Sequence, residues 1–365
     1  MKSPAVANSI INIHILVILF IIATNQSIFA QNDSIFEPKG NLIVQIINRT
    51  NLDVHNTNNF GMNINRAHFG YSYQFAHEWK GVVVLDAGRP TIFNNLKIKD
   101  SIGNDFYPQY NYQEGSHYTI SLKFSYLEYK PNKNITIQAG GILQNHYIRE
   151  EKFWGYRYIV ETFPDRYFKI PSGDLGIISY FEINEYFSAD IAFTNGEGFR
   201  SKQDEKGKFK AATGIDFKPV QGLISRLYYD VKFIDNSDLI KNEELYSIFI
   251  GYSMPSKFRV GSSYHYQTNY HHINNHDLFG FSLYGVYNIK ENIEIFARYD
   301  NLKSAKLTGS NTSWNELSDG EAYIWGFHYS PVKGISLSLS EQFWIPSNTN
   351  IDLRNEIVFS FEYKL

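Results

Sequence analysis

The chain has 365 residues and no cysteine, and Tyr (27) and Phe (28) supply most of the aromatic side chains, which make up 16% of the sequence. The lack of cysteine excludes disulfides, a thiolate metal site and a lipid anchor on cysteine, and a formal net charge of −3 gives no reason to expect nucleic acid as a partner. The mean hydropathy of −0.33 would suit a water-soluble protein, but such an average conceals strands that are apolar on one face only.

The first predicted element, residues 1–30, has the features of a secretory signal peptide. Lys2 supplies a basic start, and Ile10–Ile22 is an apolar stretch of 13 residues, whereas a helix that crosses a bilayer needs about 20. Ala30 supplies the small residue of a cleavage site. An uncleaved anchor is the alternative. We therefore expect an exported chain in which residues 31–365 form one domain.

After the leader, apolar and polar residues alternate with a period of two, which is typical of β-strands with two chemically different faces. In Gly61–Phe75, for example, Phe69 and Tyr71 fall on the face opposite Arg66 and His68. Four later segments repeat the pattern clearly: Tyr118–Tyr126, Glu321–Ser330, Ile335–Ile345 and Glu356–Leu365. About 16 such segments follow one another, each of about 8–13 residues, which is the length that a tilted membrane strand needs.

The connections between these segments are of two kinds that alternate along the chain. Very short turns such as Pro255–Lys257 and Lys333–Gly334 alternate with longer polar loops such as Arg89–His117 and Ser304–Gly320. This arrangement is typical of an up-and-down antiparallel transmembrane β-barrel with short periplasmic turns and long extracellular loops. A soluble β-sandwich would also show alternating strands, but it does not need inward Arg and Lys at mid-strand. We therefore predict an all-β barrel of about 16 strands in the outer membrane of a Gram-negative bacterium, in contact with its lipid.

A barrel of about 16 strands encloses a water-filled lumen rather than a core packed with side chains. The strand phase predicts cations on the inward face, with acids such as Asp190 and Glu294 among them. The predicted lumen-facing cations include Arg66, Lys123, Arg226, Lys232, Arg259 and Arg298, together with Arg49, Lys208, Lys210, Lys218 and Arg354. They indicate either a weak preference for anions or a wet wall whose charges are paired with their neighbours.

Residues 149–174 form the loop that is best suited to set the selectivity of such a lumen. The loop contains large aromatic residues, among them Trp154 and Phe163, which exposed loops seldom keep in water. We therefore expect it to fold into the lumen and narrow it. Its charged residues are then candidates for a pore constriction: Arg149, Lys152, Arg157, Arg166, Lys169, Glu161 and Asp165. The alternative is a loop that packs over the barrel mouth or in a subunit contact.

Three stretches resemble porins of the phosphate-selective porin O and P type, in the form common in Bacteroidota. They are Leu122–Gly140 (LKFSYLEYKPNKNITIQAG), Glu151–Tyr167 (EKFWGYRYIVETFPDRY) and Phe193–Gly214 (FTNGEGFRSKQDEKGKFKAATG). Together they cover about a sixth of the chain, and EKFWGYRY is the most specific of them. The resemblance implies a 16-stranded channel, a long third loop folded into the lumen, and a homotrimer. It does not extend to phosphate selectivity, because no ladder of basic residues can be matched and the loop carries Glu161 and Asp165 beside its cations.

Two functions fit these patterns. One is passive diffusion of small hydrophilic solutes or ions, with at most a weak preference for anions. The other is a non-conducting barrel that acts as an adhesin or surface receptor through its outer loops. We expect no enzyme, since no G-x-S-x-G motif occurs. We also expect no metal or cofactor, because His271, His272 and His276 lie in a polar loop without the helical spacing of a metal site.

Overall fold

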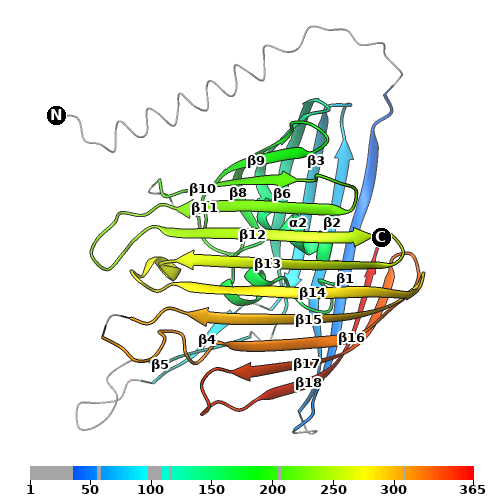
Figure 1. Ribbon diagram of the computed structural model, residues 1–365. Coiled ribbons are helices and arrows are strands. Elements are labelled where there is room, and N and C mark those ends of the chain that lie inside the picture. The colour runs from blue at the N-terminus through cyan, green and yellow to red at the C-terminus, as the bar shows by residue number, and fades with distance from the viewer. Residues whose placement is uncertain are drawn as a thin grey trace, which may run out of the picture.

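The computed structural model describes residues 36–55, 59–89, 91–97, 109–114, 117–203, 205, 207–307 and 309–365, so the predicted leader at residues 1–30 lies outside the described residues. Sixteen of the described strands close into one antiparallel barrel (Figure 1). They are β1 (Lys39–Asp53), β2 (Phe60–Gln74), β3 (Trp79–Gly88), β6 (Thr119–Asn132), β7 (Ile135–Leu143), β8 (Gly173–Glu182), β9 (Phe187–Thr194), β10 (Lys210–Phe217), β11 (Leu223–Lys232), β12 (Glu243–Met254), β13 (Phe258–Thr268), β14 (Leu278–Lys290), β15 (Ile293–Ser304), β16 (Gly320–Val332), β17 (Ile335–Pro346) and β18 (Arg354–Lys364). The predicted up-and-down β-barrel of about 16 strands is confirmed.

Each strand of the barrel pairs with its neighbours in sequence, except that β3 pairs with β6 across an inserted hairpin. That hairpin, β4 (Thr91–Lys97) with β5 (Gln109–Glu114), forms a separate sheet within a segment that the sequence suggests is a plain loop. The barrel closes where β1 pairs with β18, from Gln45 opposite Lys364 to Asp53 opposite Glu356. Each of the sixteen strands therefore has two hydrogen-bonded partners, so the barrel has no open edge.

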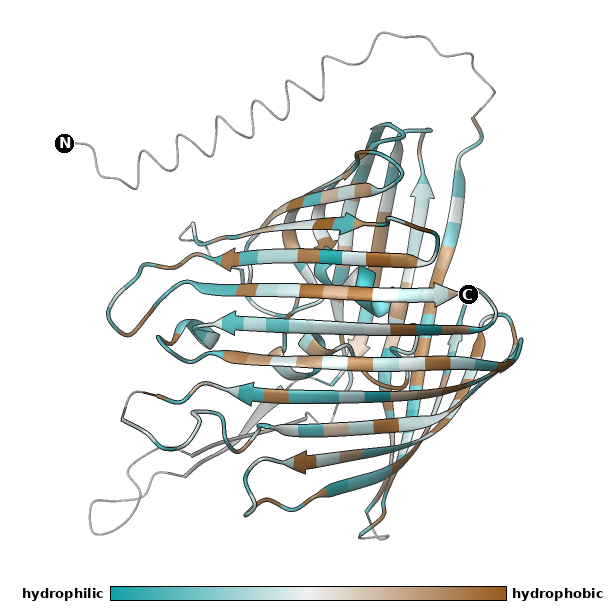
Figure 2. Ribbon diagram, in the orientation of Figure 1, coloured by the Kyte–Doolittle hydropathy of each residue, from teal (hydrophilic) through white to brown (hydrophobic). Residues whose placement is uncertain are grey.

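The two faces of the strands differ as the period-two pattern predicts. On β14, Leu283 is 52% exposed on the outer face, whereas its neighbours Ser282 and Tyr284 are 0% and 3% exposed on the inner face. The other strands repeat this pattern, and Figure 2 shows apolar and polar residues alternating along them. The outer face of the barrel is consequently a continuous apolar surface, which suits contact with hydrocarbon rather than water.

The connection between β7 and β8, residues 144–172, is the element that fills the barrel, and we name it the inner loop. It begins with a helix, α2 (Asn145–Trp154), so the predicted loop start at residue 149 lies within this helix. The helix ends at Gly155, whose φ of 76° is a left-handed conformation that glycine adopts without strain, and whose N–H donates to the Glu151 carbonyl at 2.9 Å. A short π-helical turn, Pro164–Phe168, follows. Figure 1 shows α2 within the ring of strands. No helix among the described residues is both long and apolar enough to span a membrane.

Candidate functional site

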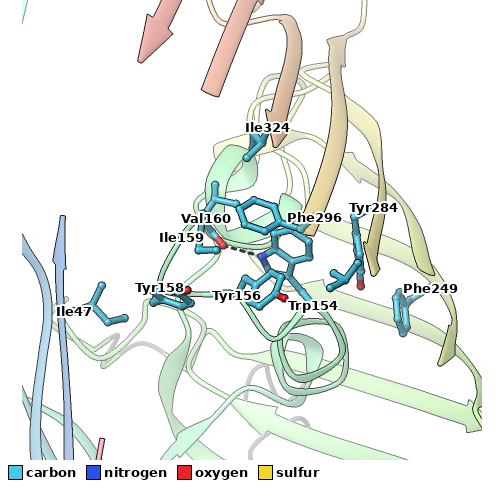
Figure 3. Packing of buried hydrophobic residues seen from close by; sticks show 11 residues of the cluster. Ile47, Trp154, Tyr156, Tyr158, Ile159, Val160, Phe249, Tyr284, Phe296 and Ile324 are labelled. Carbon is cyan, nitrogen blue, oxygen red and sulfur yellow. Dashed lines mark hydrogen bonds between the residues drawn. The ribbon is translucent and has the colours of Figure 1, made fainter. Parts of the chain in front are cut away.

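A cluster of mostly aromatic side chains attaches the inner loop to the barrel wall, with members on β12, β14, β15 and β16 and with Ile47 on β1 (Figure 3). Trp154 is fully buried, its ring centroid lies 4.8 Å from that of Tyr284 on β14, and its indole N–H donates to the Val160 carbonyl at 3.1 Å. Tyr156 packs on Phe296 of β15 at 5.1 Å. Each such large side chain contributes roughly 1.5–3 kcal/mol through burial. A second buried cluster joins Phe163 and Phe168 of the loop to residues of β7 to β12, β14 and β15, so the loop is held firmly against most of the wall.

Polar contacts reinforce this attachment. Arg298 on β15 donates to the Glu161 carbonyl at 2.7 Å and pairs with Asp300 at 2.8 Å. Arg259 on β13 donates to the Trp154 carbonyl at 3.2 Å and pairs with Glu294 at 3.3 Å. Two of the predicted lumen-facing cations thus hold the inner loop in place and are neutralised by adjacent carboxylates.

A second group of predicted cations forms ion pairs between α2 and the strands β9, β10 and β11. Arg226 lies between Asp190 at 2.7 Å and Asp216 at 2.9 Å, and Arg149 reaches the same Asp216 at 2.6 Å. The guanidinium of Arg226 occupies the space beside Gly214, where a Cβ would approach it to 2.0 Å, so this position requires glycine. Burying these charges is tolerable only because each finds a partner.

Open space remains between the inner loop and the part of the wall where residues of β1, β2, β3, β6 and β18 do not contact it. Two cavities of about 330 and 400 Å³ lie there, the first toward the long loops and the second toward the short turns. Both are lined by Arg66 of β2, Lys123 of β6, and Arg157 and Ser172 of the inner loop, so they meet at these residues. We call the two cavities together the passage.

On the loop side of the passage, Arg157 is surrounded by three carboxylates. Its guanidinium lies 3.3 Å from Glu151, 3.1 Å from Glu161 and 3.0 Å from Asp165. Enclosure raises the pKa of the Glu161 carboxyl, but the charge of Arg157 more than offsets this and brings that pKa down to about 2. For Asp165, burial prevails and holds the pKa above its usual range despite the nearby Arg157. This group, the Arg157 cluster, carries a negative charge that depends on the protonation of Asp165.

The opposite side of the passage carries a cation with no such compensation. Arg66 donates to the Gln45 side chain at 3.4 Å, and it has no ion pair within 4.0 Å among the described residues. Lys123, by contrast, belongs to a chain of contacts, since its Nζ lies 3.2 Å from His68 Nε2, which lies 3.4 Å from Asp86. A solute at the junction therefore meets Arg66 on one side and the acidic Arg157 cluster on the other.

The structure thus separates the sequence-predicted residues into groups. It brings Arg66, Lys123, Lys152, Arg157 and Asp165 together around the passage. Glu161 lines neither cavity and reaches the passage only through its ion pair with Arg157. Arg149, Arg226, Arg259 and Arg298 instead form ion pairs that support or contact the inner loop. The remaining three lie elsewhere: Arg166 and Lys169 in a third cavity, and Lys232 at the end of β11.

Arg200 lines the passage but is absent from the predicted set. It belongs to the loop after β9 and reaches Asp86 of β3 at 2.5 Å. The loop is drawn there by Asp174, whose carboxylate accepts the N–H groups of Gly196 at 2.5 Å and Gly198 at 3.2 Å. Both glycines have positive φ, of 95° and 86°. The glycine pair just before Arg200 was the available signal that this loop bends sharply.

The described residues contain no group of three His, Asp or Glu side chains suited to a metal ion.

Comparison with known proteins places the architecture among outer-membrane barrels. No family model and no curated protein matches the sequence. Three solved structures are similar in fold. The outer membrane channel DcaP of Acinetobacter baumannii aligns with a TM-score of 0.59 and 12% identity over 92% of this chain and 100% of that one. The anion-selective porin from Comamonas acidovorans aligns with a TM-score of 0.63 and 10% identity over 90% and 100% of the two chains. The trimer form of OmpT, an outer membrane protein of Vibrio cholerae, aligns with a TM-score of 0.57 and 9% identity over 90% and 100%. At such low identity, the likeness establishes a porin-like barrel fold.

Proposed function

We propose that the protein is an outer-membrane porin through which small hydrophilic solutes or ions diffuse passively, and that it is not an enzyme. The observation that carries this proposal is the passage, two cavities with charged linings that meet between the inner loop and the wall beside β2, β3 and β6. The apolar outer face suits insertion in a membrane, with the short turns in the periplasm and the long loops outside. The inner loop, residues 144–172, then acts as the constriction.

The charge of the passage supports at most a weak preference for anions. Six basic side chains line the two cavities, namely Arg66, Lys123, Lys152, Arg157, Arg200 and Lys364. Five acidic ones accompany them, namely Asp86, Glu151, Asp165, Glu197 and Glu362. Such a near balance places opposite charges across the passage and does not form a ladder of cations. Membership of the phosphate-selective porin O and P type remains a prediction from the three stretches that resemble it.

A homotrimer and a cleaved leader complete the proposal. The trimer is supported by the likeness to the trimer form of OmpT. The leader, residues 1–30, rests on its basic start and its short apolar stretch.

The proposal is tested by single-channel conductance in a planar bilayer under a KCl gradient. Refolded protein should give large, stepwise, ohmic openings. Deletion of Tyr156–Asp165 removes most of the Arg157 cluster, and it should increase the conductance because the loop no longer occupies the lumen. The matched control removes Asn348–Asn350, residues of the β17–β18 loop that do not line the passage, and it should leave the conductance unchanged. Equal conductance of the two deletion variants and the intact protein would refute the role of the inner loop.

The alternative is a non-conducting barrel that binds a macromolecule through its outer loops. Exposed apolar side chains at the long-loop end, such as Leu239 and Leu317, are the observation that favours it. A silent bilayer from protein shown to be folded would support this alternative.

A further inference from the structure

A third cavity, of about 510 Å³, lies at the long-loop end of the barrel, and we name it the outer pocket. It is bounded by the end of the inner loop, by β1, β17 and β18, and by the loops that precede β14 and β16. It shares no lining residue with the two cavities of the passage. Its volume falls within the range of small-molecule sites, roughly 300–1,000 Å³.

The outer pocket is strongly basic, unlike the passage. Its charged lining comprises four cations, Arg49, Arg166, Lys169 and Arg354, and one carboxylate, Glu356. Glu356 accepts a hydrogen bond from Asn51 at 2.9 Å. None of the four cations has an ion pair within 4.0 Å among the described residues. The pocket therefore has an excess of positive charge that an anion would compensate.

Two guanidinium groups have buried donors without a partner. Arg49 donates to Gln342 at 2.8 Å, but its Nε is buried with no acceptor among the described residues. Arg166 lies over the Tyr167 ring at 5.4 Å, and one of its terminal nitrogens is likewise buried without an acceptor. These two atoms are closed off from solvent, so a phosphate or carboxylate oxygen in the pocket would have to be bound by the other nitrogens of the two guanidinium groups. Hydrogen bonds of that kind between charged groups are short and strong.

The rest of the lining suits a ring that carries hydroxyl groups. Trp344 of β17 stacks on Tyr167 of the inner loop at 5.6 Å, and both line the pocket. Aromatic surfaces pack against the C–H face of a ring. Asn51, Asn315 and Ser318 supply amide and hydroxyl groups, and the Oδ1 atom of Asn51 is buried without a donor.

We propose that the outer pocket binds an anionic sugar, a sugar phosphate or a sugar acid, and holds it at the external mouth before it enters the passage. The anionic group pairs with Arg49 and Arg166, the ring packs near Trp344, and Lys169 and Arg354 raise the local positive potential. Lys169 has a φ of 56°, a left-handed conformation that is unfavourable for a residue with a Cβ. The delivery to the passage rests on the proposed porin function, whereas the binding itself does not.

The test is isothermal titration calorimetry of the full chain in detergent micelles, with glucose 6-phosphate, inorganic phosphate and glucose as separate probes. Glucose 6-phosphate should bind at least about tenfold more tightly than either of the others, because only it engages both the cations and the ring. Arg49→Gln and Arg166→Gln should each weaken its binding about tenfold. Lys169→Gln should weaken it less, and the matched control Lys257→Gln, in an exposed turn at the opposite end, should not change it.

The outcomes separate the site from the channel. Equal affinity for inorganic phosphate and glucose 6-phosphate would overturn recognition of the sugar ring, and unaltered binding by the Arg49→Gln and Arg166→Gln variants would overturn the site. Channel conductance is recorded on the same preparations, and circular dichroism verifies that each variant is folded. Protein that conducts but does not bind glucose 6-phosphate refutes the outer pocket and leaves the porin function intact. Protein that binds it in a silent barrel refutes the porin function and leaves the outer pocket intact.

Discussion

Arg157 shows how a single side chain can have both a structural and an electrostatic role. It connects Glu151 at the end of α2 with Glu161 and with Asp165 in the following turn, and so holds three acids of the inner loop together. It also supplies the only positive charge within the Arg157 cluster. The other cations predicted from strand phase, such as Arg226 and Arg298, differ from it because they are buried in ion pairs away from the passage.

Replacing Arg157 should therefore change the ion preference of the channel. In an Arg157→Gln variant, Glu151, Glu161 and Asp165 lose their shared cation, so the loop side of the passage becomes more negative. The reversal potential under a KCl gradient should shift toward cation preference. Lys333→Gln, which removes an exposed cation from a short turn, serves as the control and should leave the potential where it was. A shift of the Arg157→Gln variant toward anions would contradict the assignment.

The pKa values of the loop acids predict a pH dependence with a definite sign. The pKa of Asp165 is raised by burial, so this carboxyl takes up a proton at a higher pH than an ordinary aspartate does. The pKa of Glu161 is about 2, so that residue stays ionised under the same conditions. As the pH is lowered from neutral, the Arg157 cluster thus loses negative charge through Asp165, and the reversal potential should move toward anions. Asp165→Asn should abolish most of that movement. If this variant retained the full pH effect, another group would be responsible.

At the scale of the element, the inner loop combines a helix, a left-handed glycine and a π-helical turn that could not stand alone in water. Its stability comes from the apolar cluster around Trp154 rather than from its own hydrogen bonds, because α2 has only ten residues. The abundance of aromatic residues in the segment predicted that it would avoid water. The aromatic residues did not indicate where α2 begins. The predicted start of the loop was the point where the alternation of apolar and polar residues ends. The first residues of a helix can continue such an alternation by chance, so this point fell inside α2.

Trp154→Ala should loosen the inner loop without unfolding the barrel. Removing the indole leaves a cavity between the loop and β14, at a cost of about 3–5 kcal/mol to the attachment of the loop. The barrel keeps its closed hydrogen-bond ladder. The open-channel current should therefore become noisier and larger on average, while far-ultraviolet circular dichroism stays the same. Trp325→Ala is the matched control, since Trp325 is 42% exposed on the outer face and contacts no part of the loop cluster. Equal current noise in the two variants would count against this role for Trp154.

At the scale of the whole molecule, the apolar outer face predicts that lipid surrounds the barrel. Leu283 lies near the middle of β14 on the outer face. Leu283→Arg should therefore lower the free energy of unfolding in lipid vesicles by about 2–4 kcal/mol, which is the penalty for a cation at the bilayer midplane. Leu317 is 72% exposed in a long loop, so Leu317→Arg should have little effect in the same denaturant titration. Similar stabilities of the two variants would show that the outer face does not contact lipid.

The amino-acid sequence by itself determined the class of fold, because strand alternation and connection length are local properties. A period of two assigns each side chain to a face, and sixteen such segments joined alternately by short and long connections leave few arrangements other than a closed barrel. The same reasoning assigned Arg66 and Arg226 to the inward face of the barrel and Arg157 to a loop. It did not show which of these cations lie close together.

Tertiary structure alone decided which charges share a space. Arg66 and Arg157 come together at the passage because the inner loop packs on most of the wall but leaves space beside β2, β3 and β6. The outer pocket likewise arises from β1, β17, β18 and three loops, which are far apart in sequence. Arg226 is neutralised because β9 and β10 bring Asp190 and Asp216 to the same level as β11. These outcomes depend on strand stagger and on where a loop attaches, which are set by contacts between residues far apart in sequence.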